Sequence, residues 1–346
     1  MSNVGDLRKP KIRAQEVVDS ILRDQQPPDM IFFQEAFNQG ATRVLCDGIK
    51  NEYPYIIYNV GPQIGGFPSG QMIASKFPIK SVDYERFQGM VGVENMAPRG
   101  ILAATIETAD KKEMKIYSVH TAPLLGNERA QARVQQLEHI QTKMEKDSHP
   151  DLHQVLVGDF NTSRVNAWGE DNAQPANQAE APVLDKMKEF KDLYLENHTE
   201  EVIDGKFIVK IKDDESPMFL AKDNAAIGHD LIYPTASWYT GPFNHEKGKK
   251  GVVLEHNIKS DRKKHGFDKP DKLFSTANDR EWGTKNWRTK QTANTARFDY
   301  ILVPPESDLT GKAEIRRVIP SSLAQSAPTD HLPVDAIIWN APRTRT

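Results

Sequence analysis

The chain has 346 residues and a mass of 39.0 kDa, enough for one large α/β domain or two smaller ones. Its formal net charge of -3 argues against a generally basic surface that binds phosphate groups. The single cysteine, Cys46, excludes an intrachain disulfide and a cysteine-based metal site. No run approaches the ~18 apolar residues of a membrane span, and the first residues lack the apolar core of a signal peptide. The sequence therefore indicates a soluble protein and leaves its compartment open: it could be secreted or cytoplasmic, with or without peripheral contact to a membrane.

Apolar periodicity predicts two helices, from Lys11 to Gln25 and from Asn127 to Lys146. Two prolines directly after the first helix predict its end. Short apolar runs predict strands at Met30–Phe33, Tyr55–Tyr58, Met72–Ser75, Ile101–Thr105, Lys115–Val119, Val155–Val157, Tyr300–Val303 and Val334–Trp339. Helices mixed with several successive strands predict an α/β sandwich rather than a simple alternating barrel.

The region from about Ser163 to Arg297 differs from the rest of the chain. Its segment Gly169–Pro182 is polar, and we predict an exposed loop there. The segment His245–Lys272 carries nine Lys/Arg against five Asp/Glu. Such a basic run is usually a solvated loop, and the functional alternative is a surface for anionic lipid heads or nucleic acid. Nearby aromatic residues would either pack in strands or enter a membrane interface: Trp238, Tyr239 and Phe243.

Polar residues flank the apolar runs at five places. Three clusters follow predicted strands: Gln34-Glu35, His120, and Asp159 with Asn161. Two others precede strands: Asp299 and Asp330-His331. Because ligand sites of α/β sheets gather at strand ends, we expect these clusters to converge. If the last two strands run antiparallel to the earlier ones, all five clusters meet on one rim.

Each cluster taken alone also has a purely structural interpretation. Glu35 could cap a turn, and Asp159 with Asn161 could form an Asx turn. His120 and His331 could be core histidines bonded by carboxylates. The order of all five along one chain is much harder to explain by turns and core packing, and it favours a catalytic site.

Taken together, the clusters resemble the endonuclease/exonuclease/phosphatase superfamily, from about Asn3 to the last strand. The segments that carry this resemblance are Phe33-Gln34-Glu35, Val119-His120-Thr121, Gly158-Asp159-Phe160-Asn161, Phe298-Asp299-Tyr300 and Thr329–Val334. The helix with Arg133, Gln136 and Leu137 matches the usual successor of the histidine strand. Further segments look most similar to the neutral and bacterial sphingomyelinase branch: Gln34–Phe37, Glu52–Tyr55, Gly65–Ser69 and Met72–Ile79.

The resemblance implies a four-layer α/β sandwich with two mixed β-sheets flanked by helices. Residues 1–346 would form a single catalytic domain, and the long region 163–297 would supply the loops that select the substrate. The family's first strand normally delivers an asparagine, yet Asn3 lies only two residues after Met1. We therefore expect that the first strand is missing, through truncation, a misassigned start, or a sheet that forms without it.

The resemblance also implies a divalent cation, usually Mg²⁺, with other divalent cations as alternatives. Glu35 would be its principal ligand, and a hard ion that keeps several waters needs few protein ligands. Asn3 would match the asparagine that follows the family's first strand, which places it in the metal site. Asp330 would contact a metal ion or a water bound to it.

The remaining residues of the resemblance would act on the phosphate and the attacking water. His120 and Asn161 would bind phosphate oxygens and stabilise the charge that develops on them. Asp159 would position or deprotonate the water. His331 would be a general base or a transition-state donor, oriented by Asp299. The sequence leaves open whether Asp159 or His331 takes the proton.

The implied function is Mg-dependent hydrolysis of a phospholipid head-group phosphodiester at a membrane surface, as in a sphingomyelinase of phospholipase C type. Three alternatives stay open: a metal-dependent endonuclease or exonuclease acting on nucleic acid, a phosphoinositide phosphatase, and a binding module that keeps the fold without catalysis. Candidates for a tryptophan in a substrate motif are Trp238, Trp282 and Trp287. Nothing in the sequence indicates an obligate protein partner.

Overall fold

The structure is a computed structural model of the 346-residue chain. It describes residues 10–24, 27–62, 68–88, 98–123, 127–168, 173–175, 180–203, 206–211, 214–217, 294–295, 298–315 and 334–340. Within these ranges, no helix combines the length and the apolar character that crossing a membrane requires.

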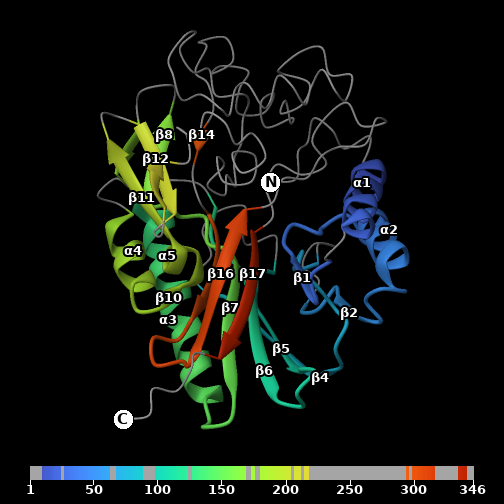
Figure 1. The fold of residues 1–346 in the computed structure, drawn as a ribbon. Coiled ribbons are helices and arrows are strands. Elements are labelled where there is room, and N and C mark those ends of the chain that lie inside the picture. Colours follow the sequence, from blue (N-terminus) through green and yellow to red (C-terminus); the bar gives the residue numbers. More distant parts are fainter. Residues whose placement is uncertain are drawn as a thin grey trace, which may run out of the picture.

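A six-stranded mixed sheet forms the centre of the molecule (Figure 1). Its strands in chain order are β4 (Ile79–Arg86), β5 (Gly100–Glu107), β6 (Glu113–His120), β7 (His153–Asp159), β10 (Lys191–Asp192) and β15 (Asp299–Val303). They lie side by side in the order β10-β15-β7-β6-β5-β4. Only β6 and β7 run parallel to each other, and the other neighbours in this sheet are antiparallel.

A second layer of strands packs on one face of this sheet. It contains an antiparallel group in the order β1-β3-β2, made of β1 (Met30–Phe33), β2 (Tyr55–Tyr58) and β3 (Met72–Ser75). It also contains the antiparallel pair β16 (Leu309–Ile315) and β17 (Val334–Asn340). Smaller sheets lie at one end of the molecule: β8 (Val165–Trp168) with β9 (Ala173–Pro175) and β14 (Asn294–Thr295), and β11 (His198–Ile203) with β12 (Lys206–Ile211) and β13 (Asp214–Pro217).

Helices cover the two outer faces. On one side lie α1 (Pro10–Arg23) and α2 (Gln39–Ile49), and on the other α3 (Asn127–Asp147) and α4 (Ala181–Met187) (Figure 1). The short helix α5 (Leu193–Asn197) instead packs Leu193 and Tyr194 into the core between the two strand layers. The start of α2 is set by Asn38, whose side chain accepts a hydrogen bond from the backbone N–H of Ala41 at 2.9 Å.

Three apolar cores separate these layers. The core between the two strand layers includes Leu102, Ala104, Ile116, Val155, Phe32 and Ile338. The core under α3 and α4 includes Ile101, Ala103, Val119, Leu137, Ile140 and Val183. The core under α1 and α2 includes Ala14, Val18, Leu45, Ile49 and Met72. Successive residues of β5 alternate between the first two cores, as the two-residue period of a strand requires. The predicted four-layer sandwich is confirmed.

The predicted elements are present with small differences at their ends. The first helix, predicted over 11–25, runs from Pro10 to Arg23. One prediction was wrong: Gly169–Pro182 is not a loop throughout, because Ala173–Pro175 pairs as β9 and α4 begins at Ala181. The apolar residues that hold α4 in place, Val183 and Met187, lie just beyond the polar stretch that suggested a loop. Asn3 lies outside the described residues, so the expected absence of the family's first strand stays a prediction.

Charged side chains join α3 to β4 and β6, on the face of the sheet that α3 covers. Lys143 of α3 lies 2.6 Å from Asp83 and 3.2 Å from Glu85, both on β4. Asp147 of α3 lies 2.8 Å from Lys115 of β6 and 3.1 Å from Lys143. Burial would raise the pKa of the Asp147 carboxyl, but hydrogen bonds from Lys115 and Lys143 outweigh it and lower that pKa below its ordinary 3.8.

We expect this network to make the protein sensitive to acid. Because the folded pKa of Asp147 lies below 3.8, its stabilising contribution is complete above that pH and is lost as the pH falls through the folded pKa. The Asp147→Asn variant should lose about 2–4 kcal/mol of unfolding free energy at pH 7 and show a flatter decline below pH 4. Urea unfolding at a series of pH values measures both effects.

A matched control is Asp47→Asn, which removes a carboxylate from an exposed pair with Lys50. Exposed pairs contribute little, so this variant should unfold like the original protein at every pH. Equal acid sensitivity of the original protein and the Asp147→Asn variant would contradict the prediction.

Candidate active site

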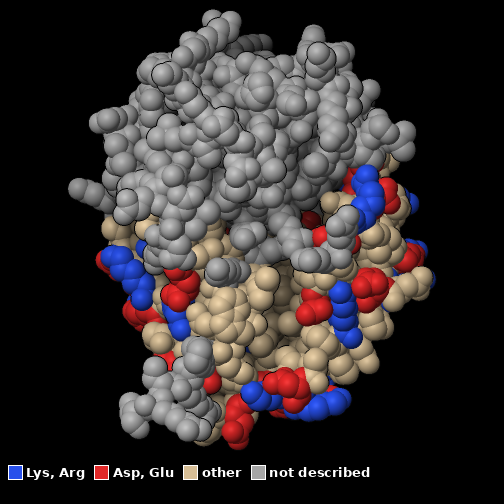
Figure 2. Space-filling model, viewed as in Figure 1, with Lys and Arg blue, Asp and Glu red and all other residues tan. Residues whose placement is uncertain are grey.

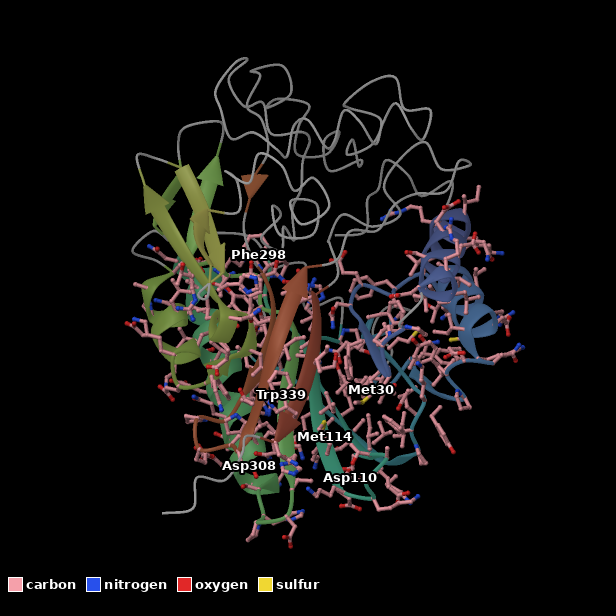
Figure 3. All side chains as sticks on the ribbon, in the orientation of Figure 1. Met30, Asp110, Met114, Phe298, Asp308 and Trp339 are labelled. Carbon is pink, nitrogen blue, oxygen red and sulfur yellow. The ribbon has the colours of Figure 1, made fainter. Side chains whose placement is uncertain are left out.

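Three strands of the six-stranded sheet bring polar residues to the same end of the sheet, which we call the rim. β6 and β7 are parallel neighbours, and their last residues, His120 and Asp159, are paired. β15 runs antiparallel to β7, so its first residue, Asp299, is also paired with Asp159. Phe298 marks this end of the sheet in Figure 3, and Asp110 and Asp308 mark the opposite end. The condition set for convergence, an antiparallel direction, is therefore met by β15, and the three residues share one rim.

Two carboxylates from different strand layers approach one nitrogen of the His120 imidazole. Its Nε2 atom is 3.4 Å from Oδ2 of Asp159 and 4.0 Å from Oε1 of Glu35. The His120 side chain is 1% exposed, whereas that of Glu35 is 21% exposed. Glu35 therefore forms the solvent-facing side of this group, and the two carboxylates concentrate negative charge around a buried ring.

Glu35 reaches the rim from the second strand layer, directly after β1. Its backbone has a φ of 60°, a left-handed conformation that costs a residue other than glycine about 1–3 kcal/mol. Hydrogen bonds hold the turn on both sides: Phe37 N–H donates to Glu35 O at 2.7 Å, and Ala36 N–H donates to Gly70 O at 2.8 Å. The cost of this backbone is consistent with a position selected for function rather than for stability.

The neighbouring Gln34 connects the two strand layers. Its Nε2 atom donates to Oγ of Ser118, which lies on β6 two residues before His120, at 3.4 Å. This contact links the segment that carries Glu35 to the strand that carries His120.

Two hydrogen bonds fix Asn161, one to the last residue of β7 and one to the residue that follows β6. Its N–H donates to Oδ1 of Asp159 at 2.8 Å, and its Nδ2 donates to the Thr121 carbonyl at 3.2 Å. Its φ is 48°, a left-handed conformation that asparagine tolerates better than most residues. The Asx turn that offered a structural interpretation is therefore present, and the same turn fixes the direction of the Asn161 amide at the rim.

Thr121 connects the loops after β6 and β7. Its N–H donates to Asp159 O at 2.9 Å, and its hydroxyl donates to Phe160 O at 2.6 Å. The Thr121 carbonyl accepts from Nη1 of buried Arg99 at 2.8 Å, in addition to its bond from Asn161. We did not predict a role for Arg99. Its only sequence signal is its place directly before the apolar run of β5, on the antiparallel neighbour of the histidine strand.

The donor set fits a hard divalent cation. Mg²⁺ prefers oxygen ligands, keeps several waters, and is held in proteins by only one or two carboxylates. Glu35 and Asp159 supply two carboxylates that approach the same ring nitrogen, Nε2 of His120, at 4.0 and 3.4 Å. Within the described ranges, no group of three or more His, Cys, Asp or Glu is placed to hold one metal ion. The fit to a cation therefore rests on the carboxylates of Glu35 and Asp159.

The described residues thus bring together five of the eight predicted site residues: Glu35, His120, Asp159, Asn161 and Asp299. The other three, Asn3, Asp330 and His331, lie outside the described residues. The same holds for the basic segment 245–272 and for the aromatic candidates Trp238, Tyr239, Phe243, Trp282 and Trp287.

Sequence comparisons match curated relatives at low identity. Sphingomyelin phosphodiesterase 5 of Danio rerio is 28% identical over 159 residues, which is 39% of this chain and 29% of that protein. A phospholipase C of Staphylococcus aureus is 27% identical over 155 residues, which is 39% of this chain and 46% of that protein. The matches therefore span less than half of the length of either relative.

Solved structures share the fold over almost the whole chain. Beta toxin from Staphylococcus aureus aligns with a TM-score of 0.54 at 16% identity, covering 95% of this chain and 92% of the toxin. A humanized TDP2 of Danio rerio aligns with the same TM-score of 0.54 at 13% identity, covering 97% and 94% of the two chains. These likenesses establish the α/β sandwich. The model of the Endonuclease/Exonuclease/phosphatase family matches residues 3–331, and this chain belongs to that family.

Proposed function

We propose that this protein is a Mg-dependent phosphodiesterase that hydrolyses a phospholipid head-group phosphodiester, as a sphingomyelinase of phospholipase C type does. The convergence of Glu35, His120, Asp159 and Asn161 on one rim carries the proposal. The relatives named sphingomyelin phosphodiesterase and phospholipase C support the lipid substrate. Beta toxin has been solved with bound magnesium ions, which supports the choice of cation.

In the proposed mechanism, Asn161 and His120 bind the phosphate oxygens. An asparagine amide has two N–H donors, and the one bonded to the Thr121 carbonyl sets the direction of the other. His120 adds a ring nitrogen 3.4 Å from the Asp159 carboxylate. Donors that are fixed before the reaction stabilise charge developing on the phosphate, and one such donor is worth about 10²–10³-fold in rate.

Asp159 would orient the attacking water or accept its proton. Its Oδ1 atom is occupied by the Asn161 N–H, so Oδ2 is the oxygen that faces His120. A carboxylate anchored through one oxygen presents the other in a fixed direction, which suits a group that must align a nucleophile. His331, oriented by Asp299, is the alternative base that the family resemblance suggests.

Glu35 would hold the cation, and we propose Asn3 and Asp330 as further residues of that site from the family resemblance. The bound cation would neutralise charge on the phosphate oxygens. Glu35 suits the task because it is the more exposed of the two carboxylates, so that retained waters can complete the coordination.

A nuclease on the same scaffold is the second candidate, favoured by the basic segment 245–272. Nucleic-acid binding gains much of its affinity from Lys and Arg that neutralise phosphates. On the face shown in Figure 2, the described acidic and basic side chains are intermixed, which gives no support to a continuous basic track there. We therefore prefer the lipid substrate and propose that residues 163–297, within a single catalytic domain, select it.

A panel of substrates tests the proposal. Purified protein is assayed with sphingomyelin and phosphatidylcholine vesicles, a phosphoinositide and plasmid DNA, each with Mg²⁺ and with EDTA. We expect release of a phosphorylated head group from a lipid, abolished by EDTA and restored by added Mg²⁺.

The other outcomes separate the alternatives. DNA nicking without lipid cleavage would replace the lipid proposal by the nuclease, and phosphate release from the phosphoinositide alone would indicate a phosphatase. Lipid cleavage that persists in EDTA would contradict the role of the cation. Binding of vesicles without any hydrolysis would indicate a binding module.

A further inference from the structure

Glu180 occupies an unusual position beside the site. It directly precedes α4 at the N-cap position, yet its side chain makes no capping hydrogen bond to that helix. It is 1% exposed, and its carboxylate turns toward the loops of the rim. Oε1 forms an ion pair with Nη2 of Arg133, and Oε2 accepts a hydrogen bond from the Thr162 hydroxyl at 2.5 Å.

Arg133, the first partner of Glu180, also bonds to the loop after His120. Arg133 lies on α3 and is fully buried. Its Nη1 donates to the Ala122 carbonyl at 2.9 Å. The N–H of the same Ala122 donates to Oε1 of Gln136, one turn further along α3, at 2.8 Å. The backbone two residues after His120 is therefore held on both its donor and its acceptor group.

Thr162, the second partner of Glu180, lies in the loop after Asp159. Thr162 follows Asn161 directly and is fully buried. Its carbonyl accepts from the Tyr300 hydroxyl at 3.1 Å, and its own hydroxyl donates to Glu180. The Glu180 carboxylate therefore connects Thr162, which follows Asn161, with α3. Helix α3 in turn holds Ala122, which follows Thr121.

Such a buried ion pair is weak evidence for stability, because desolvation of the two charges offsets much of their attraction. Its geometric effect is better defined, since an arginine and a carboxylate with fixed partners set distances and directions. We propose that Glu180 is a positioning residue that aligns His120 with Asn161 through Arg133 and Thr162. This inference rests on the proposed phosphodiesterase function.

The test uses Thr162→Val, which removes the hydroxyl, and Glu180→Gln, which removes the charge. Small misplacement of catalytic groups lowers kcat strongly, so we expect kcat to fall about 30-fold or more in each variant while KM changes less than about threefold. The double variant should lose little more than either single variant, because both break one connection. Thr162→Ser, which restores a hydroxyl, should recover most of kcat.

The control is Glu189→Gln. Glu189 follows α4 and accepts from Gln141 of α3 at 2.5 Å, so it joins the same two segments, but at an exposed place away from the rim loops. Its kcat should stay within about twofold of the original protein.

Urea unfolding of every variant separates loss of fold from loss of alignment, and Thr162→Val remains informative if Glu180→Gln does not fold. Unchanged kcat in a folded Thr162→Val variant would overturn the inference, as would no recovery in Thr162→Ser. An inactive original protein would instead refute the proposed function.

Discussion

Replacing Asp159 by Asn should lower kcat/KM by about 10²–10⁴-fold with little loss of stability. Asparagine keeps an oxygen to accept the N–H of Asn161, a bond of 2.8 Å, so the turn should persist. The variant removes the negative charge 3.4 Å from Nε2 of His120 and the group proposed to orient or deprotonate water. Steady-state kinetics on the preferred lipid, together with urea unfolding, measure the two effects separately.

The control is Asp151→Asn, the same substitution in the exposed turn that precedes the other end of β7. It should leave both activity and unfolding unchanged. Full activity of Asp159→Asn would remove Asp159 from the mechanism and leave His331 as the sole candidate base.

Replacing Gly158 by Ala should destabilise the protein by about 3 kcal/mol or more. Gly158 has a φ of 143°, which only glycine adopts readily, and an added Cβ would lie 2.0 Å from the Val119 carbonyl oxygen. That oxygen belongs to backbone on the parallel neighbour β6, so relief requires the two strands to separate beside His120 and Asp159. Urea unfolding should show the loss of stability, and the site should lose activity with it.

Gly40→Ala provides the matched control. Gly40 lies in the first turn of α2, and the atom nearest to an added Cβ is the flexible end of Lys11, at 2.8 Å. Alanine is the better helix former, so stability should be unchanged or rise by about 0.5–1 kcal/mol. Equal stability of the Gly158→Ala and Gly40→Ala variants would contradict the close approach of β6 to β7 at Gly158.

Prediction from sequence worked best where a strand is buried on both faces. β5, β6 and β7 were predicted because their apolar runs are nearly continuous, as expected between two cores. β4 was missed because it is an edge strand with mostly exposed polar residues and no such run. Glu180 was missed for another reason: a buried charge has no local signature, and its partners lie 47 and 18 residues away.

The amino-acid sequence was enough to predict the chemical groups of the candidate site, because a carboxylate, histidine, aspartate and asparagine at strand ends in this order form a specific set. It was also enough for the fold: the apolar runs predicted an α/β sandwich, and the family resemblance implied its four layers. Only the tertiary structure decided that the Asx turn of Asp159 and the candidate site are the same feature, and that Glu35 crosses from the second layer to reach His120. The reason is physical. Hydrophobic patterns specify which residues are buried, whereas the distances within a site depend on strand register and on hydrogen bonds between residues far apart in the chain.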